Sequence, residues 1–375
     1  MTAPTRSADA AFMRSILQRI ATGPELSKDI TREEAREGMR LVLDGRVDPV
    51  QAGVFLIALR MKRETDDEVC GVLDAIHETT QRVIAPVEEL IDIADPYDGS
   101  NRSLPVAPFL PAVLAACGVP AVSHGVEAMG PKYGVTHRQV LRAAGLPVDL
   151  SVEEAAAHIS DPNIGWAYVD QRVFAPKLYA LAPLRELIVK RPAVTTVEGL
   201  AGPIRARGKT HWLTGYVHKP YPRIYALLAR AAGFDSALIV RGVEGGVIPS
   251  LRQEGKFFFY RGKLAEQEQA IVPSDFGFAN GLQPPPIPEG LRPQPNDGDA
   301  PIPLDTAAIA RAAADAGMRA LKGEPGPAHD GLVTAAAVCL WHLGKHASFQ
   351  SAADSVRTAL NGGNALKNLN NAKSD

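Results

Sequence analysis

The apolar and polar positions divide the chain into two parts with different spacing. Up to about residue 88 the apolar residues recur at helical intervals and do not alternate as a half-buried strand requires. The Thr-x-x-Glu patterns at 31–34 and 65–68 match the capping box that begins a helix. A strongly apolar run at 50–59 lies between them. Residues 1–89 are therefore predicted to form a small helical domain.

From residue 90 the spacing changes. Short apolar runs alternate with Ala- and Leu-rich helical stretches such as Phe109–Gly118, which ends on a glycine as helices often do. This alternation is typical of a parallel sheet covered by helices on both faces. We predict a large α/β domain over residues 90–375 with a mostly parallel central sheet. Its expected strands include Ile91–Ala94, Ala121–Val122, His211–Val217 and Ala237–Val240.

A proline-rich stretch interrupts this domain near its end. Residues 284–303 hold eight prolines, a composition that forms neither helix nor interior strand, so an extended connector is predicted over about 283–303. Beyond it, Asp305–Lys322 and His329–Leu360 return to alanine-rich helix. The last residues, 361–375, are rich in Asn, Gly and Lys, and are expected to fray.

Composition narrows the class of protein only a little. The 375 residues carry a formal net charge of −2, with a pI of about 6.5, so a nucleic-acid or membrane partner would need a local patch. Cys70, Cys117 and Cys339 lie far apart in apolar surroundings, which favours buried reduced thiols over disulfides or zinc. The sequence shows neither a signal peptide nor a membrane span. A cytoplasmic protein without a membrane partner is expected.

Several landmarks occur in an order that points to one family. They are the run Gln51–Lys62 after Asp44-Gly45, then Phe174–Tyr179 and Pro183–Leu187, then Gly199–Pro203, and finally Asp275–Gly277 and Asp330–Leu343. In this order the chain resembles the anthranilate phosphoribosyltransferases (glycosyltransferase family three), over roughly residues 12–365. The resemblance implies the two-domain fold of nucleoside phosphorylases and phosphoribosyltransferases, with helices from about 170–190 joining the N-terminal domain. It also implies a homodimer through the N-terminal helices.

The first site landmark of that family is a Gly-Thr-Gly-Gly-Asp loop that holds phosphoribosyl diphosphate. Glycines let backbone amides approach the diphosphate closely. Here the corresponding stretch runs from Asp92 to Ser103, and only Asp98, Gly99 and Asn101 match well. Pro96 removes an amide donor and Tyr97 adds bulk. An ordinary Asp-Gly turn is the competing interpretation.

The second landmark is Lys-His-Gly-Asn-Arg, whose cations hold phosphate. This chain has Ser123-His124-Gly125-Val126-Glu127, so only His124 and Gly125 survive. The loss of two cations should weaken the binding of a polyanionic ligand by several kcal/mol, because charge-assisted contacts contribute roughly 1.5–3 kcal/mol each. Lys132 still fits the family's next ligand loop. His124 could equally be a structural hydrogen-bonding residue.

The third landmark is an Asp-Glu pair that binds magnesium. Magnesium prefers carboxylate oxygens, but the pair is replaced by Val247-Ile248, and only Glu244 remains nearby. We therefore predict no metal site and no cofactor, although the family implies magnesium. Arg185 aligns with the arginine that faces the aromatic acid, and could bind an anion bidentately or form a salt bridge with a neighbour.

Two functions follow from these residues. The first is a divergent phosphoribosyltransferase-like protein in which anthranilate transfer is doubtful. It would bind a phosphate- or nucleotide-like small molecule through Asp98, Gly99, Asn101, His124, Gly125, Lys132 and Arg185. No catalytic residue is assigned. A weaker variant is a regulatory protein that senses a nucleotide or an aromatic acid.

The alternative is a non-catalytic protein that binds single-stranded nucleic acid. The chain resembles the divergent YbiB-type homologues of the family, which keep the fold and bind nucleic acid, and Tyr97-Asp98-Gly99 resembles their turn. The segment 188–225 is basic with interleaved aromatic residues. Trp212 and Tyr216 could instead be core residues of a strand. The candidate phosphate contacts are Lys190, Arg191, Arg205, Arg207 and Lys209.

Overall fold

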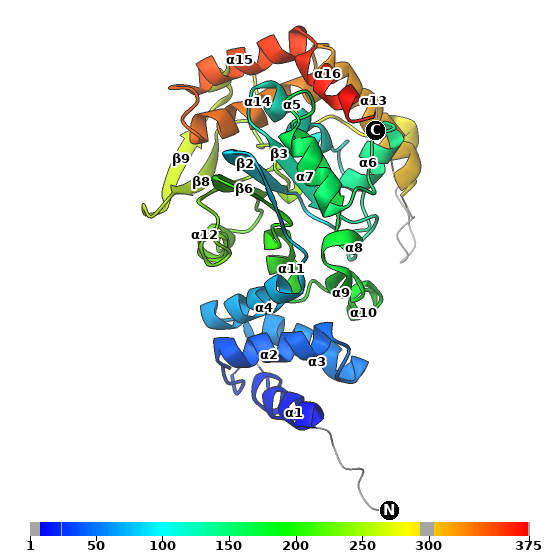
Figure 1. Ribbon diagram of the computed structural model, residues 1–375, viewed down its shortest axis with the longest axis vertical. Helices are drawn as coiled ribbons and strands as arrows, with labels where there is room; N and C mark the ends of the chain where they lie inside the picture. The colour runs from blue at the N-terminus through cyan, green and yellow to red at the C-terminus, as the bar shows by residue number, and fades with distance from the viewer. Residues whose placement is uncertain (1–7, 24, 293–303, 374–375) are drawn as a thin grey trace, which may run out of the picture.

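The computed structural model describes residues 8–23, 25–292 and 304–373. It is an elongated molecule, with a small helical domain at one end and a large α/β domain at the other (Figure 1). The prediction of a small helical domain followed by an α/β domain with a mostly parallel sheet is confirmed. Residues 293–303 of the predicted proline-rich connector lie outside the described residues.

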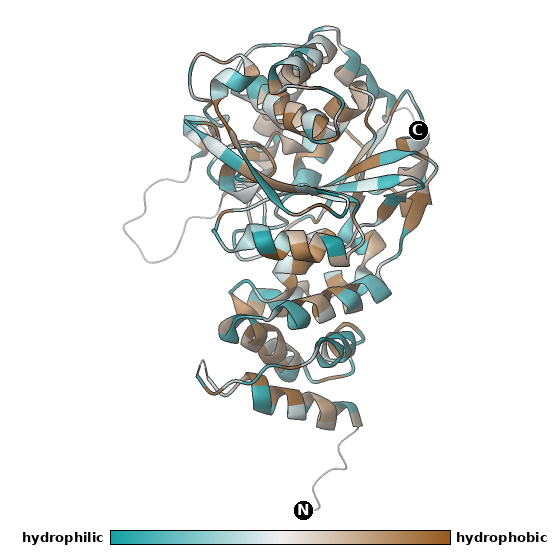
Figure 2. Cartoon of the chain, turned by 90° about the vertical axis from the view of Figure 1, so that its left-hand side faces the viewer, coloured by the Kyte–Doolittle hydropathy of each residue, from teal (hydrophilic) through white to brown (hydrophobic). Residues whose placement is uncertain are grey.

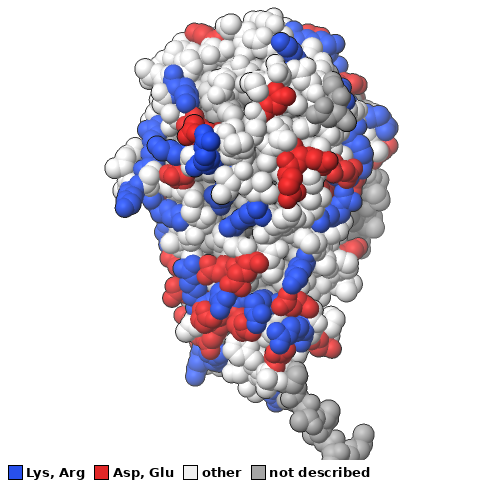
Figure 3. Space-filling model, viewed as in Figure 1, with Lys and Arg blue, Asp and Glu red and all other residues white. Residues whose placement is uncertain are grey.

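The N-terminal domain consists of α1 (Ala8–Ile20), α2 (Arg32–Leu43), α3 (Pro49–Lys62) and α4 (Asp66–Thr79). Both predicted capping boxes are present at the starts of α2 and α4. The apolar faces of these helices pack against one another, as Figure 2 shows. Figure 3 shows acidic and basic side chains mixed over the surface of this domain. Among its ion pairs, Arg32 lies 2.6 Å from Asp74.

The central sheet has seven strands in the order β4-β3-β2-β6-β7-β8-β9, of which the first five run parallel. A separate two-stranded parallel sheet joins β1 and β5, so residues 83–85, expected to be helical, form a short strand. The strands are β1 (Val83–Ala85), β2 (Glu89–Ala94), β3 (Ala121–Gly125), β4 (Trp166–Asp170), β5 (Ile204–Ala206), β6 (Lys209–Gly215), β7 (Ser236–Val240), β8 (Gly255–Arg261) and β9 (Gln267–Ile271).

Alternate residues of each parallel strand enter different cores. Ile91 and Ile93 of β2 pack against the C-terminal helices, whereas Leu90 and Ala94 belong to the core that continues into the N-terminal helices. This is the two-sided burial expected of a parallel sheet. The covering helices are α5 (Leu110–Ala116), α6 (His137–Ala143), α7 (Val152–Ser160), α12 (Tyr221–Ala231), α13 (Thr306–Leu321), α14 (Pro327–His342), α15 (Phe349–Asn361) and α16 (Asn364–Asn371).

Short helices connect the two domains in the middle of the molecule (Figure 1). One of them, α10, packs against α3, where Leu184 lies above Gly53. These helices are α8 (Gln171–Phe174), α9 (Pro176–Tyr179), α10 (Ala182–Ile188) and α11 (Val194–Val197). Single 3-10 turns are η1 (Ala107–Phe109), η2 (Glu198–Leu200), η3 (Val243–Gly245), η4 (Pro273–Phe276) and η5 (Glu289–Leu291).

The prediction that residues 361–375 fray is wrong for most of that segment. Residues 364–371 form α16, and Leu369 is fully buried. The indole nitrogen of Trp166 donates to the carbonyl of Asn368 at 3.1 Å, and the Asn368 amide donates to Ile164. These tertiary contacts override an unfavourable local composition. In the described part of the chain, no helix combines the length and apolarity that a membrane crossing needs.

Candidate functional site at the carboxyl edge of the sheet

The loop after β2 and the loop after β3 meet at the carboxyl edge of the sheet. Ser100 and Val135 exchange backbone hydrogen bonds of 2.9 and 2.7 Å, and the Gly134 amide donates to the Asp98 carbonyl. Gly99 has φ +73°, and a Cβ there would lie 2.6 Å from the Gly134 backbone. Glycine is therefore required for the close approach. The loops that carry Asp98 and Lys132 therefore lie against each other.

Asp98 is the point where these loops meet the basic residues. Its carboxylate lies 3.4 Å from the Lys132 ammonium on one oxygen and accepts a hydrogen bond from Arg191 on the other. The Asp98 side chain is largely buried, whereas Arg191 is 44% exposed. Asp98, Lys132 and Arg191 thus form a cluster in which one carboxylate lies between two cations. In this arrangement Asp98 takes the place that an anionic ligand could occupy.

The Glu244 carboxylate satisfies the backbone hydrogen-bond donors of the loop after β2. Its carboxylate accepts hydrogen bonds from the amides of Asn101 and Arg102, both at 3.0 Å, and from the Ser103 hydroxyl at 2.9 Å. Three donors converging on one group form an anion-binding concavity. Glu244 adopts φ +53° to reach it, a conformation that costs a non-glycine residue of order 1–3 kcal/mol. The hydrogen bonds offset this strain.

Asp95 closes the other side of the loop. One of its oxygens accepts the Val247 amide at 2.8 Å, and the other lies 3.1 Å from a ring nitrogen of buried His137. The Val247 side chain is buried, so the position where the resemblance implies a magnesium ligand is apolar here. Valine and isoleucine offer no oxygen to a magnesium ion, and Asp95 already accepts the Val247 amide. Among the described residues, no group of three or more His, Cys, Asp or Glu could hold a metal ion.

What remains between these groups is a narrow slot of about 30 Å³. That volume holds one or two water molecules, so a phosphate could enter only if the surrounding side chains moved. Its wall is mainly apolar, and the residues that line it include Asp95, Ser100, Ser103, Leu104, Val106, Val247, Ile248, Pro284 and Pro285.

His124 lies below this loop in a buried hydrogen-bond chain. Its Nε2 is 2.8 Å from the Asp92 carboxylate, and its Nδ1 pairs with the Tyr97 hydroxyl. Burial raises the pKa of Tyr97 well above its ordinary value. Gly125, which follows, lets the Tyr168 hydroxyl approach to 3.4 Å of where its Cβ would be. Both ring nitrogens of His124 have partners, so the residue supports the loop from within.

Arg185 is committed to a buried ion pair. Its guanidinium donates to both oxygens of Glu198 at 2.7 and 2.8 Å, and to the Thr195 hydroxyl at 3.2 Å. The side chains of Arg185 and Glu198 are 2% and 5% exposed. The bidentate face that would recognise a carboxylate is occupied by Glu198.

The five candidate nucleic-acid contacts do not gather on one surface. Arg191 lies beside Asp98 at the carboxyl edge, whereas exposed Arg207 pairs with Glu88 at the amino end of β2. These ends are about 20 Å apart, since six residues rise about 3.3 Å each. Arg205 stacks on Phe234 at 3.7 Å, and burial lowers its pKa. Lys190 and Lys209 are exposed.

Two aromatic residues of the basic segment are not free for stacking on bases, whereas His218 is exposed. Trp212 and Tyr216 are only 2% and 6% exposed and belong to the core, as the competing interpretation held. Sequence reasoning also missed the roles of Glu244, Asp95 and His137. The position of Glu244 in the sequence could have indicated its role. Glu244 follows the parallel strand β7, and the carboxyl ends of parallel strands lie at one edge of the sheet.

The comparisons with known proteins agree with this architecture. A family model described as "Glycosyl transferase family, helical bundle domain" matches residues 14–80. An uncharacterized protein of Aquifex aeolicus is 31% identical over 224 residues, which cover 59% of this chain and 65% of that protein. The anthranilate phosphoribosyltransferase of Nitrobacter hamburgensis is 27% identical over 361 residues, covering 95% and 96%.

Solved structures show the same fold. The anthranilate phosphoribosyltransferase of Thermus thermophilus superimposes with a TM-score of 0.72 at 23% identity, over 97% of this chain and 98% of that one. The Saccharomyces cerevisiae enzyme in complex with PRPP and Mg gives 0.72 at 15% identity over the same shares. The chain therefore begins with a helical bundle similar to that of the glycosyltransferase family, and as a whole it has the fold of the anthranilate phosphoribosyltransferases. In sequence it is similar to those enzymes along nearly its full length.

Proposed function

We propose that this chain is a divergent member of the phosphoribosyl-transferring family that does not carry out magnesium-dependent transfer to anthranilate. It would instead use the remnant of the site for a smaller or less charged phosphate- or nucleotide-like ligand. The residues proposed to contact it are Asp98, Gly99, Asn101, Gly125 and Lys132. His124 and Arg185 are proposed to support the site from within, because their side chains are already paired with other residues of the chain.

One observation carries the first half of the proposal. The Glu244 carboxylate accepts hydrogen bonds from the Asn101 and Arg102 amides, in the loop that the resemblance assigns to the diphosphate. A diphosphate would have to displace Glu244 and tolerate its charge at short range. Displacement at the anomeric carbon also requires the leaving diphosphate to be neutralised. Val247 and Ile248 cannot hold an ion for that purpose.

The test is consumption of phosphoribosyl diphosphate by the purified chain with anthranilate and magnesium. The Saccharomyces cerevisiae enzyme, whose structure contains PRPP and Mg, serves as the positive control. We expect no magnesium-dependent turnover above background and no calorimetric heat of PRPP binding. Robust turnover would show that the interpretation of Glu244 and of Val247-Ile248 is wrong.

Binding of single-stranded nucleic acid is the alternative outcome of the same work. The exposed cations Lys190 and Arg191 lie at one edge of the sheet and Arg207 and Lys209 at the other, so few could contact one short strand. We therefore expect weak binding of a labelled oligonucleotide. Tight binding with a steep salt dependence, about 0.7 log units per neutralised phosphate for single strands, would favour the alternative.

The proposed homodimer has a candidate surface on the N-terminal side. Val50 of α3, with Leu187 and Val189 at the end of α10, are 73%, 81% and 65% exposed. Helices α3 and α10 contact each other, so these apolar side chains flank one helix pair. Light scattering after size-exclusion chromatography should give twice the chain mass, and Leu187→Asp should shift it to the monomer. A monomeric wild type would contradict the proposal.

A further inference from the structure

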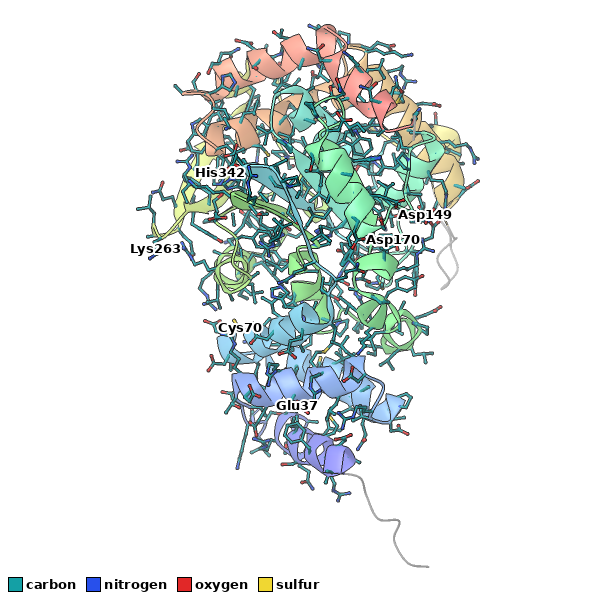
Figure 4. The ribbon with its side chains drawn as sticks, viewed as in Figure 1. Glu37, Cys70, Asp149, Asp170, Lys263 and His342 are labelled. Carbon is teal, nitrogen blue, oxygen red and sulfur yellow. The ribbon has the colours of Figure 1, made fainter. Side chains whose placement is uncertain are left out.

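A glycine-rich turn after β7 brings Glu244 to the loop after β2. We call residues 242–246 the Glu244 turn, and three of them are glycines. The base of this turn is closed, because Gly242 forms a backbone bridge with Pro249. The turn lies at the carboxyl edge of the sheet, the edge marked in Figure 4 by Asp170, which is the last residue of β4.

The Glu244 side chain alone ties the tip of this turn to the loop after β2 by hydrogen bonds. In the described structure, the backbone of residues 243–246 makes its hydrogen bonds within the turn and to the residues just after it. Only the carboxylate reaches across, to the amides of Asn101 and Arg102 and to the Ser103 hydroxyl. Another anionic group that took these three donors would therefore release the tip and leave the base intact.

The backbone of Glu244 is strained, and release of the tip would relax it. Its φ of +53° and ψ of 19° lie in the left-handed region, which residues other than glycine rarely adopt. Glycines at 242, 245 and 246 give the chain around it a wide range of dihedral angles. The carboxylate therefore keeps its partners against a local strain that favours its departure.

The narrow slot described above borders the Glu244 turn. Val243 and Gly246 of the turn line the slot together with Ser100 and Ser103 of the loop after β2. The remaining residues that line it are apolar apart from Asp95. Because the turn borders both the anion-binding donors and this apolar space, its displacement would open them to each other.

Arg102 adds a cation that no described acid neutralises. Its amide donates to Glu244, but its side chain is exposed and forms no ion pair with a described residue. Lys132, by contrast, already lies 3.4 Å from Asp98. A guanidinium can bind a phosphate through two parallel hydrogen bonds. The residue whose amide holds the Glu244 carboxylate therefore also favours a phosphate in its place.

We propose that the Glu244 turn is a displaceable gate, whose carboxylate occupies the donors until an organic phosphate with an apolar body replaces it. The phosphate takes the Asn101 and Arg102 amides and the Ser103 hydroxyl, and the apolar body enters the widened slot. Inorganic phosphate gains no apolar contact and competes poorly with a carboxylate tethered at high effective concentration. This inference rests on the proposed function, since it gives the ligand class and the gate of the same carboxyl-edge site.

Calorimetric titration of the full chain with phenyl phosphate, inorganic phosphate and phenol tests the ligand class. We expect phenyl phosphate to bind the wild type in the millimolar range. The other two should bind at least about tenfold more weakly, because each lacks one part of the contacts. Equal affinities for phenyl phosphate and inorganic phosphate would show that the slot takes no part, which would overturn the proposal. So would the absence of phenyl phosphate binding at about 20 mM, far above the expected range.

Variants of Glu244 test the gate. Glu244→Ala removes the competing carboxylate, so it should tighten phenyl phosphate binding at least about tenfold and allow inorganic phosphate to bind. Glu244→Gln keeps the length of the side chain without its charge and should have an intermediate affinity. Glu289→Ala, which removes an exposed acid from η5, is the matched control and should stay within about twofold of the wild type. Equal or weaker binding by Glu244→Ala would contradict the gate. If Glu244→Ala does not fold, the Glu244→Gln result decides.

Hydrogen exchange measured by mass spectrometry reports the movement of the turn. When phenyl phosphate binds the wild type, the amides of Gly245 and Gly246 should exchange faster, because the hydrogen bonds within the turn open. The amides of Asn101 and Arg102 should stay protected by the phosphate. Slower exchange in both segments would show that the turn closes over the ligand, and would overturn the gate.

Failure of the gate and failure of the proposed function give different results. Phosphate binding that Lys132→Ala abolishes and Glu244→Ala leaves unchanged would retain the carboxyl-edge ligand site and overturn the gate. Magnesium-dependent consumption of phosphoribosyl diphosphate with anthranilate would contradict the proposed function. Binding of phenyl phosphate that increases in Glu244→Ala would still support the gate in that case.

Discussion

The two edges of the central sheet contain similar polar residues but use them differently. At the carboxyl edge, Asp95, Asp98 and Glu244 satisfy the donors and cations that a ligand would need. At the amino edge, Arg261 donates to backbone carbonyls and has no acidic partner among the described residues. The two edges therefore differ in whether carboxylates already occupy the cations and backbone amides, and less in how many charges each edge carries.

The largest loss of stability is expected from substitution of the buried ion pair beside the carboxyl edge. Arg185→Ala or Glu198→Ala should each lower the free energy of unfolding by about 3–5 kcal/mol, because the remaining partner is a buried, unpaired charge. Urea denaturation measures this. Replacing both residues by Met and Leu should recover most of the loss. If Arg185→Ala left stability unchanged and removed only ligand binding, Arg185 would be a ligand contact.

Two buried histidines, His342 at the amino edge and His77 of α4, should dominate the response to mild acid. Burial lowers the pKa of His342 to about 3 and that of His77 to about 4, whereas both titrate near 6.5 when unfolded. The unfolded chain therefore takes up protons first, so this stabilisation is complete above pH 6.5 and is lost as pH falls toward 4. Between pH 7 and pH 5 we expect a loss of about 2–4 kcal/mol. The urea midpoint should fall more steeply with decreasing pH in the wild type than in His342→Gln. Equal pH dependence in the two proteins would exclude His342 as a cause of the loss of stability in acid.

Opening the anion-binding loop should have an intermediate effect. Glu244→Ala leaves the Asn101 and Arg102 amides without their acceptor and should cost about 1–3 kcal/mol. Millimolar inorganic pyrophosphate should then raise the melting temperature of the variant but not of the wild type, since a ligand of the native state stabilises it. Glu289→Ala, which removes an exposed acid on η5, is the control. Equal pyrophosphate effects on all three proteins would mean that Glu244 blocks nothing.

The smallest effect is expected for the exposed pair at the amino edge. Arg207 and Glu88 are 63% and 76% exposed, and surface pairs of this kind contribute at most about 1 kcal/mol. Arg207→Ala should change the unfolding free energy by about 0.5 kcal/mol or less. A loss of oligonucleotide binding in this variant, without loss in Lys190→Ala, would instead assign the nucleic-acid surface to this edge.

Much of the fold could be predicted from the sequence because its signals are local. The capping boxes at Thr31 and Thr65 and the apolar runs of the parallel strands depend on neighbouring residues. The site could be predicted only in outline. Loss of the magnesium pair is visible at Val247, but the contact of Glu244 with Asn101 spans 143 residues and follows no local pattern.

The same distinction explains the errors. Arg185 carries the residue type that binds carboxylates, and the sequence does not show that Glu198, 13 positions later, already occupies it. Residues 364–371 have a composition typical of a fraying end, but Trp166, about 200 positions earlier, provides the partner that orders Asn368. The type of a residue indicates what its side chain can bind. Whether another residue of the chain already binds that side chain is decided by the tertiary structure.

The apolar core that begins between the N-terminal helices continues without interruption to one face of the sheet. Phe55 and Leu73 of the helical domain belong to the same buried cluster as Leu90 and Trp212 of the strands. Separate cores would let each domain melt by itself, but a shared core couples their unfolding. The helical bundle and the sheet should therefore unfold together in one cooperative transition. Its attachment to the larger domain is then an integral part of folding, and the two domains are a single thermodynamic unit.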